Sequence, residues 1–597
     1  MKSSIPLALT ALFATAASLF ASDAPTAPSS SSEWRSELYP VDWEPGKVFL
    51  DGYSLNDFSY AGYHSGQKPL PIANSREPVF DVTEAPFLAD PTGTRDSTTA
   101  IQGAIEAASQ AGGGVVFIPE GVFRISPQTP YIDGRKRTVF HIQTSNLVVR
   151  GAGPKKTHLF NDDPMMRTTS IFHVSPRIRQ NGPPLWFVPK SETTPLEQDI
   201  PKGATTLQID DVDKFAIGDT VSIREDVTQQ FIDSFAPREI FSRLQKLNLG
   251  QIYPRKIIGI ERETNTLTFD IPVHTNLRAD ANLRIFKIQP LLEEVGIEHL
   301  SIGMILDPSI AANSATRKGN APGGNDVEDW IYFSNGIEHG DWKQLLNSET
   351  SSLYGLHASY LIHFEHVANS WIRDVHTYRP ESNREAVHLL SNGFALDWSR
   401  QITVTGCHLA NTAFVGGGGN GYGISMGGQD CLVEQTSIDR FRRPISHRFR
   451  STAGNVILEC SFSNSIGADW HMWLSPANLM DSITVDRCII EAHFRGPDHG
   501  FGTTETVIWN TTGKQYRPSW YDPDNSFIIN TDQTGKGYVI GTSGPAFEVR
   551  RDSVDTKEPD WVEGVGRGDT LVPQSLYRDQ LSRRLARAEP QKPILEN

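Results

Sequence analysis

The sequence predicts an all-β protein whose main part is a right-handed parallel β-helix, a solenoid of short strands stacked coil upon coil. The first observation is a repeated pattern, apolar-x-apolar-x-x-apolar-x-apolar, in which two alternating runs flank a corner. Its third apolar slot advances by 32, 29, 24 and 28 residues, an interval that suits one coil of a solenoid. A single coil cannot bury its apolar side, whereas stacked coils share one continuous core. The slot is occupied by Val375, Cys407, Thr436, Cys460 and Cys488.

Composition is the second observation. The chain has 597 residues, 49 glycines and 38 prolines, which suits many short strands joined by corners. A net charge of −15 argues against a nucleic-acid partner, because phosphate binding requires a basic surface. Only four cysteines are present, and three of them share one slot of the repeat. We therefore expect buried thiols, with disulfides as the alternative, and no Cys-x-x-Cys spacing indicates zinc.

Residues 1–21 have the features of a secretory signal peptide: Lys2, then an apolar run that ends at Phe20, then Ala21. A membrane anchor is the alternative, but the run is short for a bilayer span. We therefore expect a secreted protein, extracellular or periplasmic, with no membrane partner. Residues 22–87 contain a linker and an aromatic segment that we expect to wrap the solenoid or cap its first coil.

Residues 88–188 are predicted to hold a cap and the first coils. Asp96 or Ser97 can cap a helix whose apolar residues recur at helical spacing from Ile101 to Ala108, and three glycines then end it. Buried-type strands follow. An amphipathic helix here can cover the open end of the solenoid, which would otherwise expose unpaired strand edges.

This stretch, Asp96-Ser-Thr-Thr-Ala-Ile-Gln and then Gly114-Val-Val-Phe-Ile-Pro-Glu-Gly, resembles the N-terminal cap of the pectate-lyase-like superfamily. The resemblance implies a secreted β-helix protein with a polysaccharide partner. It does not choose among the polysaccharide lyases, glycoside hydrolases, epimerases and phage tailspikes of that superfamily. Many relatives use Ca²⁺, so calcium stays open as a cofactor, but no oxygen-ligand cluster of diagnostic spacing is present and we assign no metal ligand.

The remaining chain divides into three parts. Residues 189–287 interrupt the coil pattern with short alternating strands between turn residues, which predicts a small inserted antiparallel β domain. Residues 288–545 resume the pattern and should form the main coils with the active-site groove. In the tail, residues 546–597, leucines at helical spacing among charged residues predict a short amphipathic helix.

Histidines recur at nearly the same interval as the core pattern. His447 and His471 are 24 residues apart, which equals one advance of that pattern, so we expect them on adjacent coils, about 5 Å apart. His499 follows 28 residues later, and His388 lies 59 residues before His447, close to two coils. We predict a column of histidines on one solvent-facing wall. The alternative is a polar ladder with a purely structural role.

Charged residues accompany this column. Neutral histidine can exchange protons near pH 7, and arginine can anchor a carboxylate or a sulfate. We predict His447 or His471 as the catalytic acid or base, with Asp469 orienting His471. Arg448 is the predicted anion anchor beside them. The predicted substrate-binding residues are His388, Tyr422, Arg450, Arg495, Asp498, His499 and Trp473.

Two mechanisms compete for this site. β-Elimination on a uronic acid polymer needs a base at C5 and cations that stabilise an enolate-like anion. Hydrolysis needs two carboxyl groups across the scissile bond, for which Asp469 and Asp498 are candidates. Histidine and arginine outnumber unpaired carboxylates here, so we predict a polysaccharide lyase, with a glycoside hydrolase as the first alternative. A non-catalytic glycan-binding β-helix and a C5-epimerase are the further alternatives.

Overall fold

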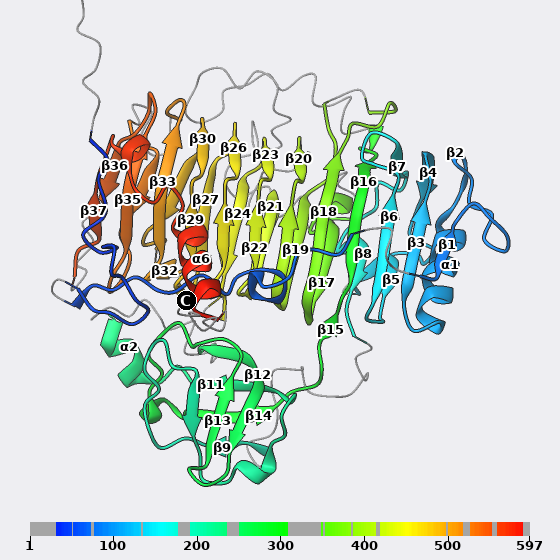
Figure 1. Cartoon of the computed structure of the whole chain (residues 1–597). Helices are drawn as coiled ribbons and strands as arrows, with labels where there is room; N and C mark the ends of the chain where they lie inside the picture. The colour runs from blue at the N-terminus through cyan, green and yellow to red at the C-terminus, as the bar shows by residue number, and fades with distance from the viewer. Residues whose placement is uncertain are drawn as a thin grey trace, which may run out of the picture.

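A computed structural model confirms the predicted fold class. Its 29-stranded sheet winds into a right-handed parallel β-helix, and a separate antiparallel sheet lies beside it (Figure 1). The structure describes residues 32–49, 52–72, 77–132, 135–176, 192–235, 250–308, 348–349, 353–383, 386–413, 418–449, 451–496, 499–517, 526–551 and 558–588.

The coils contribute strands to three faces of the solenoid, which we call sheets A, B and C. Sheet A contains β1 (Val79–Asp81), β3 (Gly114–Ile118), β6 (Leu147–Gly151), the first part of β16 (Gly296–Met304), the middle of β18 (Val367–Thr377), the end of β19 (Asn392–Thr405), β22 (Leu432–Glu434), β25 (Val456–Leu458), β29 (Leu479–Asp481), β33 (Val507–Gly513), β35 (Tyr538–Ser543) and β37 (Trp561–Glu563). Sheet B contains β2 (Thr92–Asp96), β4 (Gly121–Ile125), β7 (Thr157–Asn161), the ends of β16 and β18, β20 (His408–Ala410), β23 (Ser437–Asp439), β26 (Ser461–Ser463), β30 (Thr484–Asp486) and the ends of β33 and β35. Sheet C contains β5 (Arg137–Ile142), β8 (Thr169–Val174), β17 (Tyr360–Glu365), the start of β19, β21 (Tyr422–Gln429), β24 (Arg443–Arg448), β27 (Gly467–Met472), β31 (Ile489–Ala492), β34 (Ile529–Thr531) and β36 (Val549–Arg551). The short strands β15 (Leu292–Glu293), β28 (Ser475–Pro476) and β32 (Thr503–Thr504) pair at corners.

Apolar side chains stack inside the solenoid in columns that run from coil to coil. Because alternate residues of a strand face opposite sides, the apolar slots of the repeat all point inward. One such column is Ile297, Ile372, Val404, Val433, Ile457, Met480, Ile508 and Val539. Each of these side chains is fully buried, and burial of one such residue stabilises the fold by about 1.5–3 kcal/mol.

Helix α1 (Thr98–Gln110) covers the N-terminal end of the solenoid (Figure 1). Its buried residues are spaced by three and four positions, so one face of the helix packs on the first coil. The chain leaves the helix through Gly113, whose φ of 135° suits glycine. A Cβ atom at this position would lie only 2.5 Å from the carbonyl oxygen of Asn146.

The outer face of sheet A is covered by other parts of the chain. Residues 32–72 run along it, and helix α6 (Leu576–Ala588) packs beside them (Figure 1). Trp509 and Tyr538 are fully buried where these parts meet the sheet. The first turn of α6 is held by Asp481, whose Oδ2 atom accepts a hydrogen bond from the Tyr577 amide at 2.8 Å. Sheet A is therefore enclosed on both faces.

The inserted domain is a six-stranded antiparallel sheet with the strand order β10-β13-β12-β11-β14-β9. Its elements are β9 (Thr194–Pro195), β10 (Thr206–Gln208), β11 (Thr220–Arg224), α2 (Gln229–Phe235), β12 (Ile252–Glu261), β13 (Thr266–Phe269) and β14 (Arg284–Lys287). The alternating residues of these strands bury one face of the sheet, as the sequence predicts.

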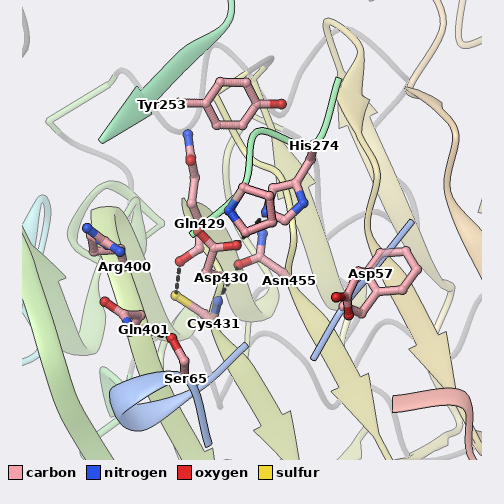
Figure 2. A network of polar contacts seen from close by, with 12 residues as sticks. Asp57, Ser65, Tyr253, His274, Arg400, Gln401, Gln429, Asp430, Cys431 and Asn455 are labelled. Carbon is pink, nitrogen blue, oxygen red and sulfur yellow. Dashed lines mark hydrogen bonds and ion pairs between the residues drawn. The ribbon is translucent and has the colours of Figure 1, made fainter. Parts of the chain in front are cut away.

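A buried network of ion pairs docks the inserted domain on a corner of the coils. Asp430 follows β21, and its carboxylate lies 3.2 Å from Arg255 Nη1 and 2.5 Å from His274 Nε2 (Figure 2). The carbonyl oxygen of Asp430 also accepts a hydrogen bond from the Gly62 amide at 2.8 Å. The inserted domain, the coils and the N-terminal segment therefore meet at this residue.

All four cysteines are free thiols buried in the solenoid. Burial raises the pKa of each thiol to about 12. Within the part of the chain that the structure describes, no helix is both long and apolar enough to cross a membrane.

Candidate active site

Sheet C presents a row of polar side chains on its outer face. From coil to coil, one register position is occupied by His141, His173 and His363, whose rings stack at centroid distances of 5.2 and 5.0 Å. The same position continues through small residues to Asp469 and Glu491. Because every member projects outward from the same sheet, residues far apart in sequence form one polar surface.

A group of charged residues surrounds Asp469, on β27. Its Oδ2 atom lies 3.1 Å from Arg443 Nε, 3.3 Å from Arg495 Nη1 and 3.3 Å from His471 Nδ1. Glu491, one coil further on β31, pairs with the same two arginines. We call this group the His471 cluster; its members are Asp397, Tyr422, Arg442, Arg443, Arg448, Asp469, His471, Glu491, Arg495 and His499.

The carboxylates of the cluster are held in the ionised form. Burial opposes ionisation of Asp469, but the charges of Arg443 and Arg495 outweigh it and hold the pKa well below its usual value. Burial likewise opposes ionisation of Glu491, and Arg443 again keeps its pKa low. At Asp397, a hydrogen bond from His363 and the charge of Arg448 overcome burial in the same way and lower the pKa. These carboxyl groups are therefore proton-free at neutral pH.

His471 is the neutral proton acceptor of the cluster. Burial lowers its pKa to about 4, although Asp469 favours the charged form. With Nδ1 3.3 Å from the ionised Asp469, the proton belongs on Nδ1 and the Nε2 lone pair is left to accept another. The rings of Tyr422 and His499 approach the imidazole edge-on, at centroid distances of 6.0 and 5.0 Å.

Tyr422 lies between two arginines. The guanidinium carbons of Arg442 and Arg448 are 5.9 and 5.8 Å from the centre of its ring. Arg448 is also paired with Asp397 at 3.4 Å. Among the described residues no carboxylate lies within ion-pair distance of Arg442, and its buried Nη1 has no hydrogen-bond partner there. Arg442 therefore keeps the capacity to bind a carboxylate of a ligand.

The structure corrects the prediction for His447. This residue is fully buried and occupies a core column between Met426 and Trp470, with its ring stacked on the Trp470 ring at 5.0 Å. His447 pairs with Trp470, an advance of 23 residues, whereas Arg448 pairs with Met472, an advance of 24, because a bulge separates the two. A shift of one residue turns a side chain to the opposite face of the strand. His447 therefore faces the core, while His471 lies in the outer cluster.

The structure places the other predicted residues as follows. Arg448, Asp469, His471, Arg495 and His499 lie together, with Tyr422 beside them. His388 lies elsewhere, near sheet B, and its imidazole contacts Thr377 and Asn411 at 3.1 and 3.2 Å. Trp473 is buried in an apolar cluster and does not line the polar surface. Arg450 and Asp498 lie outside the described residues.

Four members of the cluster were not among the predicted site residues: Asp397, Arg442, Arg443 and Glu491. A signal existed for Glu491, which stands one coil, 22 residues, after Asp469 at the same register position. For the others, the sequence gives no sign that the start of β24 and the end of one coil of sheet C approach the same histidine.

The cluster does not have the character of a calcium site. Calcium prefers six to eight oxygen ligands, several of them carboxylates not already bound by cations. Here Asp397, Asp469 and Glu491 are each paired with an arginine. In the described part of the chain, no group of three histidine, cysteine or acidic residues has an arrangement that could hold a metal ion.

Comparison with known families supports the resemblance seen in the N-terminal cap. Residues 83–192 match the family model described as rhamnogalacturonase A/epimerase, pectate lyase-like. This segment is pectate-lyase-like. The match confirms the predicted resemblance, and the pectate-lyase-like segment includes α1 and the first coils.

Individual relatives match smaller shares or lower identities. Alginate lyase 7 of Azotobacter vinelandii is 42% identical over 71 residues, which are 12% of this chain and 8% of that protein. The ORF18 protein of Geobacillus virus E2 has a TM-score of 0.39 at 10% identity, covering 82% of this chain and 62% of that one. The Gp54 tailspike of Acinetobacter baumannii bacteriophage AP22, solved with a capsular saccharide, has a TM-score of 0.37 at 12% identity and covers 81% and 69%.

Proposed function

We propose that this chain is a secreted enzyme that cleaves an anionic, uronic acid-containing polysaccharide by β-elimination. The protonation pattern of the His471 cluster supports the proposal best. Its carboxylates are held ionised, while His471 is neutral at neutral pH. Elimination needs a neutral base and cationic groups, whereas hydrolysis needs one carboxyl group that keeps its proton.

In the proposed reaction, His471 Nε2 takes the proton from C5 of a uronate ring. The electrons of the C5–H bond form an enolate-like anion with the sugar carboxylate. The C4–O4 bond then breaks, its electron pair leaves with O4, and a C4=C5 double bond forms. The proton now on His471 is available to the departing oxygen, which restores the neutral imidazole.

Arginines stabilise the anion in this scheme. Arg442 has no carboxylate partner among the described residues and lies on the same tyrosine ring as Arg448. We therefore assign the substrate carboxylate to Arg442, with Arg448 adding positive charge while Asp397 holds it. Fixed cations aimed at developing negative charge lower the barrier without reorganisation during the reaction.

The comparisons support the substrate class. The pectate-lyase-like segment and the similarity to alginate lyase 7 agree with a lyase that acts on a polysaccharide. Secretion is the part of the proposal that rests on residues 1–21, which lie outside the described residues.

Two outcomes separate elimination from its alternatives. Incubation with a panel of uronic acid and neutral glycans should raise both reducing ends and the ultraviolet absorbance of unsaturated uronates. Reducing ends without absorbance would identify a hydrolase. Altered uronate configuration without chain cleavage would identify a C5-epimerase, and binding without any change would identify a glycan-binding protein.

His471→Ala tests the proposed base. Loss of a positioned general base typically reduces the rate by about 10²–10⁴-fold, so cleavage should nearly vanish. The matched control is His408→Ala, a histidine on sheet B whose ring bonds to Ser437. The control should keep its activity, and a fully active His471→Ala would remove this residue from the mechanism.

A further inference from the structure

An apolar cluster of the inserted domain lies directly beneath the His471 cluster. On the inserted-domain side it consists of Val227, Phe231 and Ile232, from helix α2 and the turn before it. On the solenoid side it consists of Phe449, Met472, Trp473, Leu474, Phe494 and Phe501. We call these residues the α2 cluster.

The solenoid members of the α2 cluster are chain neighbours of the polar site residues. Arg448 is followed by Phe449, and His471 is followed by Met472 and Trp473. The rings of Phe449 and Trp473 contact each other at a centroid distance of 5.5 Å. The strands that carry Arg448 and His471 therefore both end in the α2 cluster.

The loop that carries Arg495 and His499 is closed by the same cluster. Phe494 and Phe501 form an antiparallel bridge, and their rings are 5.2 Å apart. Two backbone hydrogen bonds then connect this loop to the end of β27. The Trp473 amide donates to the His499 carbonyl at 3.2 Å, and the Leu474 amide donates to the Phe501 carbonyl at 3.0 Å.

The backbone at these strand ends is strained. Phe449, Trp473 and Leu474 have φ values of 71°, 61° and 58°, in the left-handed region that bulky residues rarely occupy. Such conformations persist only when surrounding packing holds them. Trp473 and Leu474 are buried against the inserted domain, so helix α2 supplies part of that packing.

We propose that helix α2 of the inserted domain positions the active site, with Phe231 as the central positioning residue, so that the inserted domain is required for turnover. Phe231 does not belong to the His471 cluster and acts through Trp473 and Phe449. The inference rests on the proposed function for the identity of the reaction, although the positioning itself can be measured without a substrate.

The inserted domain has a second attachment that makes a selective test feasible. Asp430, Arg255 and His274 hold it on the coil corner through fully buried ion pairs, outside the α2 cluster. Shortening a side chain of α2 should therefore loosen the strand ends at His471 while the domain stays docked.

The experiment compares Phe231→Ala with Phe215→Ala in the full chain. Phe215 is also a buried phenylalanine of the inserted domain, but it lies in that domain's own core. Phe231→Ala should reduce kcat at least tenfold with a smaller change in KM, and Phe231→Leu should restore most of the loss. Phe215→Ala should keep kcat. Equal losses in both variants would show a general stability effect and would overturn the proposal.

A second readout does not depend on the reaction. The imidazole signal of His471, assigned from its absence in His471→Ala, is titrated by NMR in each protein. We expect the His471 pKa to rise from about 4 towards that of an exposed histidine in Phe231→Ala, because the site opens to water. An unchanged pKa together with unchanged kinetics would overturn the positioning role, whereas a shifted pKa in a protein inactive on uronates would reject only the proposed function.

Should Phe231→Ala fail to fold, Val227→Ala provides a milder truncation at the same cluster. The same direction of change in kcat and in the His471 pKa is expected. Wild-type values of both in a folded Val227→Ala would contradict the proposal.

Discussion

His471 combines burial with a carboxylate partner, and this combination predicts the pH dependence of turnover. Its pKa is lowered to about 4 by burial, so the imidazole stays neutral above that pH. We expect kcat/KM on a uronic acid polymer to be maintained down to about pH 5 and to fall about tenfold per pH unit below about 4. Initial rates between pH 3 and 8 check this. An acid limb near 6.5 would instead indicate an exposed histidine as the base.

His447 predicts a pH effect on stability and not on catalysis. Its pKa is lowered to about 3 by burial, so the folded state binds its proton less readily than the unfolded chain. Stability from the neutral ring is complete above about pH 6.5 and is lost as the pH falls towards the folded pKa, at about 1.4 kcal/mol per pH unit. His447→Met should remove this loss. Urea unfolding at pH 7 and pH 5 measures it as a difference of about 2 kcal/mol between the proteins.

Activity is the control for this substitution. The His447 ring is sealed between core side chains, so the variant should cleave substrate at the wild-type rate. A large loss of activity without loss of stability would return His447 to the catalytic site.

At the scale of single elements, strand β16 is stabilised by an ion-pair network across coils. Glu298 is fully buried and accepts hydrogen bonds from Arg150 of β6 and from Arg373 and Trp371 of β18. Burial opposes its ionisation, but these hydrogen bonds and the charge of Arg373 lower its pKa overall. Its contribution is present above about pH 4.5 and is lost as the pH falls through the lower, folded-state pKa.

Glu298→Gln should destabilise the fold by about 3 kcal/mol, because two arginines lose their compensating charge. Urea unfolding at pH 7 measures the change. The control is Glu120→Gln, whose ion pair with Lys156 is largely exposed and should contribute less than about 0.5 kcal/mol. Similar losses in both variants would contradict the assigned role of the buried network.

Strands β24 and β27 show how far the sequence alone could predict the site. The repeat correctly predicts that adjacent coils bring Arg448, Asp469 and His471 to one region, since all three follow the inward apolar slots of the same strands. It could not reveal the bulge after His447, because a bulge leaves no pattern in the apolar spacing. Nor could it assign Arg442 or Asp397, whose roles depend on which carboxylate each arginine reaches.

At the scale of the whole molecule, the inserted domain and the solenoid form one unit through Asp430. Removing this charge would leave Arg255 buried without its partner, which typically costs about 3–5 kcal/mol. Asp430→Asn should therefore loosen the docked domain, and hydrogen exchange should accelerate in β11 and β12 before it does in the coils.

The control is Asp213→Asn, in the same domain. Asp213 pairs with Arg262, and both side chains are exposed, so exchange rates should be unchanged. If Asp430→Asn accelerated exchange uniformly throughout the chain, the domain and the coils would form one cooperative unit and the docking role would be wrong.

The overall architecture was predictable because solenoids repeat the same pattern in every coil, so weak signals add up over many copies. The inserted sheet was likewise visible as alternation between turn residues. Its docking was not, since Arg255, His274 and Asp430 are distant in sequence and each lacks a local pattern. The same holds for Phe231, which lies far from Trp473 in the chain.

The stacked cysteines make this molecule its own reporter of unwinding. Cys407, Cys431, Cys460 and Cys488 lie on successive coils, and thiols with a pKa near 12 carry almost no thiolate at neutral pH. An alkylating reagent should therefore spare the native protein and mark a coil only when it opens. Mass spectrometry of the labelled peptides would then read, coil by coil, the order in which the spring comes apart.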